Sequence, residues 1–354
     1  MDSLLERKLI VVTGKGGTGK TTVACALGLL GARRGLRTIV VELSDQHRLP
    51  ALFAEDRADS QSAPQDFVQP TPRAPQAGVE VELEADLWST AIDPDRALHE
   101  WLRTLAGRLS ARLLAASSTF HYFAAAAPGA KELVTMVKLL RLCESTYDLV
   151  VLDAPATGHA LAMLTSPQTF SAIVRAGPLS DQAQEVRALL ADRARCAYVA
   201  VAQGTEMTVT ETLELEEGLR RQLDRDLDAV LVNGVLPRRF TREEMGRIEA
   251  VAPVASSTAS PGDGASSAVS AGESSPGARA GDAPADEAVI DQAVRAAQAT
   301  YERTRIQQSQ IARLRRQRFA DGRPPKVLTI PFLFTPELDL GAVREIAAGL
   351  ERKL

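Results

Sequence analysis

The sequence predicts an α/β fold: a doubly wound, mainly parallel sheet of about seven to eight strands flanked by helices. Several short segments are continuous apolar runs, which suit parallel strands covered on both faces. Helical patterns separate most of these runs, and this alternation is typical of strand–helix–strand units. The chain has 354 residues, 45% of them hydrophobic, enough for a sizeable core. We therefore expect a single domain over residues 1–354.

The elements can be placed in chain order from their apolar runs and helical periodicity. The expected strands lie near residues 8–13, 37–43, 87–92, 147–153, 197–202, 227–233 and 326–331. The expected helices lie near residues 21–34, 94–116, 130–145, 183–193, 208–223 and 340–353. A further long helix is expected where Ile290, Val294 and Tyr301 form one apolar stripe.

Two stretches interrupt this alternation. Residues 59–78 carry four prolines among small polar residues, and residues 252–286 are almost wholly Ala, Ser, Gly, Pro and Asp. Neither stretch has enough large apolar side chains to offset the entropy lost on ordering. We expect a flexible loop at 59–78 and a disordered insertion at 252–286.

A glycine-rich segment, residues 13–22, follows the first expected strand and precedes the first expected helix. Gly14, Gly19, Lys20 and Thr21 fill the phosphate-binding pattern of Gly, four residues, then Gly-Lys-Ser/Thr. Glycines let backbone N–H groups surround phosphate oxygens, and the helix N-terminus favours the same anion. In this pattern Lys20 binds the β/γ-phosphates and the Thr21 hydroxyl binds Mg²⁺. The residues expected to bind ATP here are Gly14, Gly16, Gly17, Thr18, Gly19, Lys20, Thr21 and Thr22.

A second lysine, Lys15, narrows the class of phosphate-binding loop. The resulting Lys-Gly-Gly-X-Gly-Lys-Thr resembles the deviant Walker form of dimeric ATPases such as ArsA, MinD, ParA and the nitrogenase iron protein. The resemblance implies that Lys15 contacts nucleotide phosphates, often those bound by the partner subunit, and acts on transition-state charge as an arginine finger does. A solvated loop lysine is the alternative.

Asp153 ends the most apolar expected strand, where an acid beside a phosphate loop can anchor the Mg²⁺ shell. Residues 153–159 read Asp-Ala-Pro-Ala-Thr-Gly-His and resemble the second switch of the ArsA family, the anion-pump and tail-anchored-protein-targeting ATPases. This resemblance implies a P-loop ATPase that binds Mg·ATP and works as a homodimer or as a heterodimer with a paralogue. Thr21 and Asp153 are the expected metal residues, with Lys15, Lys20 and Asp153 in the hydrolytic machinery.

Two positions near the end of the sheet resemble the family's adenine pocket. Asn233 ends a strand, and its amide can donate to and accept from the edge of adenine. Asn233-Gly234 is also a common turn pair. Pro331 follows the last strand where the family closes this pocket, and a packed strand end is an equal alternative there.

The segment at the end of the second expected strand, residues 41–49, corresponds to the first switch of the family that it resembles, and it departs from the family pattern. Ser44 stands where ArsA-type ATPases have a catalytic aspartate, Asp45 is one residue further on, and Glu42 is a second carboxylate nearby. We assign the catalytic role to Asp45. The family's metalloid-binding cysteines and Cys-x-x-Cys are absent, and the stretch 165–197 is short and not rich in methionine. Arsenite efflux and classical tail-anchor targeting therefore lose support.

Composition argues against other classes of partner. The net charge is −4 and the three cysteines are scattered, without a disulfide framework or zinc spacing. The N-terminal residues lack the apolar core of a signal peptide, so we expect a cytoplasmic protein without stable membrane insertion. The arginines at 313–318 favour a solvated helix end over a nucleic-acid patch. The amphipathic stretch 340–354 suits a helix packed on the sheet, with membrane association as the alternative.

Together these features predict an ATPase that uses Mg·ATP hydrolysis as a dimeric conformational switch for a protein partner or effector, without binding nucleic acid. One alternative is a nucleotide-gated binding module with little turnover, which Ser44 favours. The other is a positioning ATPase of the ParA or MinD kind, which the amphipathic C-terminal stretch favours.

Overall fold

The computed structural model describes residues 4–43, 47–60, 78–108, 129–173, 178–251, 283–318 and 324–354. The chain separates into two compact units: Met1–Val235 with Gln307–Leu354, and Leu236–Ile306. Helix α11 crosses the boundary between the units, so the single domain expected from the sequence stays a prediction.

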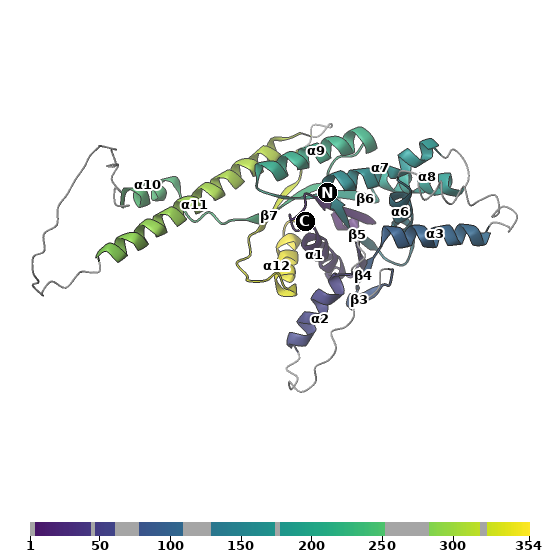
Figure 1. Cartoon of the computed structure of the whole chain (residues 1–354), viewed down its shortest axis with the longest axis horizontal. Helices are drawn as coiled ribbons and strands as arrows, with labels where there is room; N and C mark the ends of the chain where they lie inside the picture. The colour runs from purple at the N-terminus through teal and green to yellow at the C-terminus, as the bar shows by residue number, and fades with distance from the viewer. Residues whose placement is uncertain are drawn as a thin grey trace, which may run out of the picture. The chain divides into compact units, whose positions relative to one another are not determined.

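The larger unit contains one eight-stranded sheet in the order β3-β4-β2-β5-β1-β6-β7-β8 (Figure 1). Every neighbouring pair is parallel except β3 with β4. The strands are β1 (Leu9–Gly14), β2 (Thr38–Glu42), β3 (Val81–Glu84), β4 (Leu87–Ala91), β5 (Leu149–Ala156), β6 (Cys196–Gln203), β7 (Ala229–Val235) and β8 (Val327–Pro331). This is the predicted doubly wound α/β fold.

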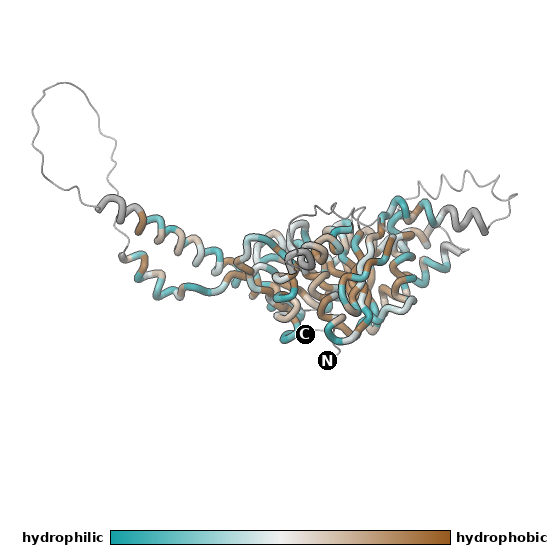
Figure 2. The backbone as a smooth tube through the Cα atoms, turned by 90° about the horizontal axis from the view of Figure 1, so that it is seen from below, coloured by the Kyte–Doolittle hydropathy of each residue, from teal (hydrophilic) through white to brown (hydrophobic). Residues whose placement is uncertain are grey.

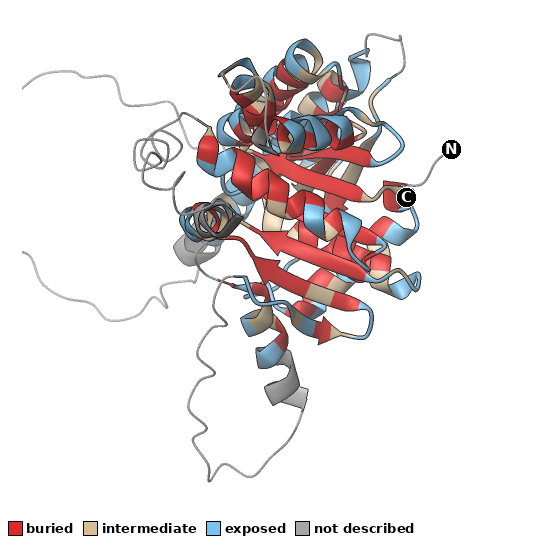
Figure 3. Cartoon of the chain, turned by 90° about the vertical axis from the view of Figure 1, so that its right-hand side faces the viewer, coloured by how far each residue is buried: buried red, intermediate tan, exposed pale blue. Residues whose placement is uncertain are grey.

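Helices cover both faces of the sheet, so the strands lie in the interior (Figure 3). Alternate strand residues face opposite sides: Leu9 and Val11 join one hydrophobic cluster, Ile10 and Val12 the other. Hydrophobic residues are accordingly concentrated inside this unit (Figure 2). One face is covered by α1 (Lys20–Arg33), α2 (Leu49–Ser60) and α12 (Leu340–Glu351). The other is covered by α3 (Pro94–Arg108), α6 (Ala130–Glu144), α7 (Thr157–Ile173), α8 (Pro178–Ala191), α9 (Glu206–Leu223) and the end of α11 (Ala283–Arg316).

All seven strands expected from apolar runs are present, but β3 is not apparent from the sequence. This strand is short, and only Leu83 of its four residues is buried. Helices α2 and α7 also lack a predictable pattern, because neither has a well-separated apolar face. The short 3-10 helix Leu4–Glu6 was likewise not expected.

Each of the two interrupting stretches is helical at one end: residues 59–78 at the start, and residues 252–286 at the finish. Helix α2 reaches Ser60, and α11 begins at Ala283. The rest of the expected flexible loop, apart from Gly78, and the rest of the expected insertion lie outside the described residues. The smaller unit contains α10 (Arg242–Val251) and the first part of α11, where Gln298 Nε2 donates to Glu249 Oε1 at 3.2 Å.

The C-terminal helix α12 packs on the sheet, in agreement with the ordinary interpretation of its pattern. The buried apolar residues of α12 join the cluster that includes α1; they are Leu340, Val343, Ile346, Ala347 and Leu350. At the end of α11, Arg313 donates to Thr210 Oγ1 at 3.1 Å, while Arg315 and Arg316 are exposed. This arrangement suits the expected solvated helix end.

Candidate functional site

The glycine-rich loop joins the end of β1 to the start of α1, and its backbone requires glycine at three positions. Gly14, Gly17 and Gly19 have φ angles of 145°, 79° and 91°, which side chains disfavour. A Cβ atom on Gly14 would lie 2.1 Å from the carbonyl oxygen of Val201, and one on Gly19 would lie 2.4 Å from Asn233 Nδ2. Gly16 has open space around it and no positive φ, so neither packing nor backbone conformation requires glycine at this position.

The loop is closed by hydrogen bonds to the backbone of Lys15. Lys20 Nζ and Thr18 Oγ1 donate to the Lys15 carbonyl oxygen at 3.1 and 2.9 Å. Lys20 begins α1 with Thr21 and Thr22 behind it, and the N-cap residue, Gly19, makes no side-chain capping hydrogen bond. Burial lowers the pKa of Lys20 from its ordinary value, and the negative charge of Asp153 opposes that shift. A half-buried ammonium and an uncapped helix start therefore lie at the same loop, which favours a bound anion.

Asp153 lies beside the first turn of α1, on the strand next to β1. Thr21 Oγ1 donates to Asp153 Oδ2 at 2.6 Å. Among the described residues, Asp153 Oδ1 and Thr157 Oγ1 are buried without a hydrogen-bond partner. Burial raises the pKa of Asp153, opposed by the Thr21 hydrogen bond and the Lys20 charge. Oxygen atoms of this kind are the ligands that Mg²⁺ prefers, directly or through water, so the residues present fit the ion.

Glu42 ends β2 and is paired in register with Asp153 on β5. Its carboxylate does not face an open site: Oε2 accepts the backbone N–H groups of Arg48 at 3.1 Å and Leu49 at 3.2 Å. Burial raises the pKa of Glu42 to about 7, opposed mainly by these two hydrogen bonds. The His47 ring is buried 3.8 Å from this carboxylate, and burial lowers its pKa to about 4.

Lys15 is paired within its own chain. Its ammonium forms an ion pair and hydrogen bond with Glu211 on α9, and both side chains are partly exposed. Gln203, at the end of β6, donates to the Gly17 carbonyl oxygen at 3.4 Å. The sequence reasoning missed Glu211 and Gln203, since nothing local links these positions to the loop.

The two expected adenine residues lie on neighbouring strands. Asn233 Nδ2 donates to the Thr18 carbonyl oxygen at 2.9 Å, which places this amide against the glycine-rich loop. Pro331 ends β8, and the N–H of Phe332 then donates to Val235 at 2.9 Å. Phe332 and Phe334 form an exposed edge-to-face pair with ring centroids 5.0 Å apart. Contact of Asn233 and Pro331 with adenine stays a prediction.

The structure thus brings together Lys15, Lys20, Thr21 and Asp153, while Asp45 lies outside the described residues. Asp153 lies in the second half of β5, which runs three residues beyond it to Ala156 instead of ending there as expected from the sequence. A glycine-rich loop between a parallel strand and a helix, with a threonine and this aspartate beside it, defines a P-loop nucleotide-binding protein.

Comparison with known proteins finds similarity to a family of ATPases. Residues 7–178 match the anion-transporting ATPase family, ArsA. The chain is 28% identical over 252 residues to the ATPase BagA of Mycobacterium tuberculosis, covering 68% of each chain. It is 23% identical over 275 residues to the ATPase GET3C of Arabidopsis thaliana, covering 67% of this chain and 69% of the relative. A shorter match, 32% over 161 residues, is to ATPase ASNA1 homolog 1 of Paramecium tetraurelia, covering 45% of this chain and 44% of the relative.

Residues 7–178 are similar to the ArsA-like ATPases, and the chain is an ATP-hydrolysing enzyme. None of its described helices is both long enough and apolar enough to cross a membrane.

Proposed function

We propose that this ATPase is a Mg·ATP-dependent conformational switch that works as a dimer, with the nucleotide held at the β1–α1 loop and Lys15 acting across the interface. The hydrogen bond between Thr21 and Asp153, at the base of a loop with a second lysine, carries this proposal. Lys20 and the loop amides hold the phosphates, and Asn233 and Pro331 flank the adenine. Such a switch serves a protein partner or effector.

Thr21 and Asp153 are the residues that would hold the metal in this account. Bound Mg²⁺ neutralises charge on the β- and γ-phosphate oxygens. The unpartnered Asp153 Oδ1 and Thr157 Oγ1 are the described groups best placed to bind ordered water or phosphate oxygens there. Asp153 lies in the second half of β5 and Thr157 is the first residue of α7, which follows β5 directly, so a change at the phosphate can be passed to α7.

Helix α7 is closely packed on α9, the helix that carries Glu211. A Cβ atom on Gly218 of α9 would lie 2.5 Å from Leu161 Cδ2 of α7, so Leu161 packs directly against the backbone of α9 at this glycine. Movement at Thr157 would therefore act on the Lys15–Glu211 pair through direct contact. In a dimer, Lys15 has to leave Glu211 before it can contact a nucleotide bound by the partner subunit.

Asp153→Asn is expected to raise the Mg²⁺ concentration needed for half-maximal turnover by at least about ten-fold, because asparagine keeps the shape but removes the charge. Nucleotide affinity without metal should change little. Titration of ATPase activity with Mg²⁺, beside binding of ATP in EDTA, is the measurement. An unchanged Mg²⁺ requirement would remove Asp153 from the metal site.

Substitutions in the first switch segment, at Ser44 and Asp45, distinguish an ATPase that hydrolyses ATP from a nucleotide-gated binding module with little turnover. An attacking water needs a group that orients it, and we propose that Asp45 supplies this group, since the Ser44 hydroxyl is a poor base at neutral pH. Asp45→Asn is expected to lower kcat at least about ten-fold while ATP affinity stays within a few-fold. If Asp45→Asn turns over like wild type and Ser44→Asp speeds hydrolysis, the slow binding module is the better account.

A further inference from the structure

The buried carboxylate of Glu42 acts on the backbone of the chain that follows β2. Glu42 is 3% exposed, and its Oε2 atom accepts two successive backbone N–H groups, those of Arg48 and Leu49. These donors lie at the start of α2, where the N–H groups have no partner within the helix. A negative charge at a helix N-terminus is favourable, so Glu42 caps α2 from a separate strand.

This cap fixes where Arg48 lies. The Arg48 backbone is held within hydrogen-bond distance of a carboxylate whose strand is paired in register with that of Asp153. The Arg48 side chain is exposed, and its charge lowers the pKa of both Glu42 and Asp153. The cap therefore holds the Arg48 backbone at the end of β2, the strand whose last residue is paired in register with Asp153.

We propose that Glu42 is a positioning residue for ATP hydrolysis: it caps α2 and thereby holds the Arg48 cation beside the site formed by Thr21 and Asp153. This inference rests on the proposed nucleotide site. Arg48 adds positive charge where charge develops during phosphoryl transfer. Both oxygens of Glu42 accept backbone N–H groups, Oε2 from Arg48 and Leu49 and Oε1 from Arg48 at 3.4 Å, so in this account Glu42 serves the helix rather than the metal.

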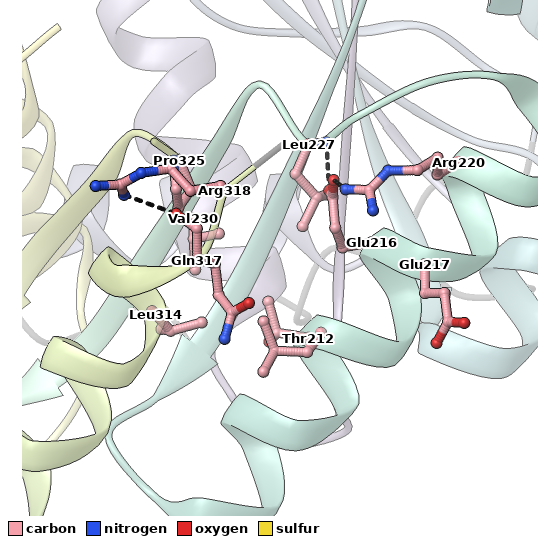
Figure 4. Close-up of a pocket in the computed structure, with 11 residues that line it drawn as sticks. Thr212, Glu216, Glu217, Arg220, Leu227, Val230, Leu314, Gln317, Arg318 and Pro325 are labelled. Carbon is pink, nitrogen blue, oxygen red and sulfur yellow. Dashed lines mark hydrogen bonds and ion pairs between the residues drawn. The ribbon is translucent and has the colours of Figure 1, made fainter. Parts of the chain in front are cut away.

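Glu216 provides a matched control, and Figure 4 shows it beside Leu227 and Arg220. It is also a buried glutamate with a pKa raised by burial to about 7, and it accepts the backbone N–H of Leu227 at 2.7 Å. Its second partner is Arg220, at 2.8 Å. Leu227 lies two residues before β7 begins at Ala229, whereas the phosphate loop lies at the carboxyl ends of the strands. Glu216→Gln removes a similar buried charge without touching the site.

Hydrogen–deuterium exchange of the full chain without nucleotide tests the cap itself. In Glu42→Ala, a peptide covering residues 47–53 is expected to exchange at least about ten-fold faster than in wild type, because the two amides lose their acceptor. In Glu42→Gln the remaining carbonyl oxygen should retain part of the protection, and in Glu216→Gln this peptide should be unchanged. Unchanged exchange in both Glu42 variants would overturn the proposal.

Steady-state kinetics tests the positioning role. Glu42→Ala and Arg48→Ala are each expected to lower kcat at least about ten-fold, with KM for ATP and the Mg²⁺ requirement within about three-fold of wild type. The double variant, Glu42→Ala with Arg48→Ala, should be no slower than the slower single variant, because the two changes remove the same effect. Arg48→Lys should restore part of kcat, and Glu216→Gln should match wild-type kcat.

Two results would contradict this account. A ten-fold higher Mg²⁺ requirement with unchanged kcat in Glu42→Ala would make Glu42 part of the metal shell. Independent, multiplicative losses in the double variant would show that Glu42 does not act through Arg48. The exchange experiment needs no ATP, so the two proposals can fail separately. A wild-type chain without ATP turnover would count against the proposed function. Rapid exchange of the 47–53 peptide in the wild-type chain would count against the Glu42 cap.

Discussion

Replacing Lys20 by alanine is expected to abolish binding of Mg·ATP, weakening the affinity by at least about 100-fold. The Lys20 ammonium is half-buried and lies at the loop where phosphates would bind, donating to the Lys15 carbonyl oxygen. Among the described residues, no other lysine side chain donates to that oxygen. Removal of a charge-assisted contact to two phosphate groups costs several kcal/mol in such a site, on the order of 3.

Isothermal titration with Mg·ATP is the measurement for Lys20→Ala. Lys131→Ala is a suitable control, since Lys131 is an exposed lysine on α6 that pairs with Asp95. The control should bind ATP as wild type does, and both variants should keep a wild-type circular dichroism spectrum. Unchanged affinity in a folded Lys20→Ala protein would show that the nucleotide binds elsewhere.

Lys15→Ala is expected to keep ATP binding within a few-fold and to lose turnover by at least about 100-fold. The Lys15 carbonyl oxygen, rather than its side chain, accepts the hydrogen bonds from Lys20 and Thr18. The variant should therefore keep the loop intact and lose only the second ammonium. Cations that stabilise transition-state charge contribute about 10³–10⁵ to kcat in related phosphoryl transfers.

Single-turnover hydrolysis, measured beside nucleotide affinity, separates these two effects of Lys15→Ala. Glu211→Gln provides the companion variant, because it removes the partner of Lys15 within the chain and leaves the lysine in place. This variant should hydrolyse ATP at least as fast as wild type. Full activity in Lys15→Ala would reject a catalytic role for the second lysine.

The fold and the centre of the site could be predicted because their signals are local. Continuous apolar runs identify the buried parallel strands, and the loop motif lies between one such strand and a helix. Asp153 could be placed because carboxyl ends of parallel strands meet at one edge of the sheet. The Thr21–Asp153 hydrogen bond brings together residues from two such segments.

The rest of the site depends on contacts that no local pattern records. Glu211 lies 196 positions from Lys15, and helical periodicity says only that it is on a surface helix. Glu42 is only a second carboxylate near Asp45 in the sequence, and its carboxylate caps a helix that itself lacks a clear apolar stripe. The strand β3 is short and mostly exposed on one side, which hides it among polar residues.

Mixing the two lysine variants tests the central claim, that one subunit's Lys15 acts on the nucleotide held by another. Lys15→Ala binds ATP but lacks the second lysine, while Lys20→Ala offers Lys15 but no nucleotide. If Lys15 acts across an interface, an equimolar mixture should hydrolyse ATP several-fold faster than the sum of the two variants alone, rising with protein concentration. A mixture that only matches that sum would contradict a dimeric switch with a shared site.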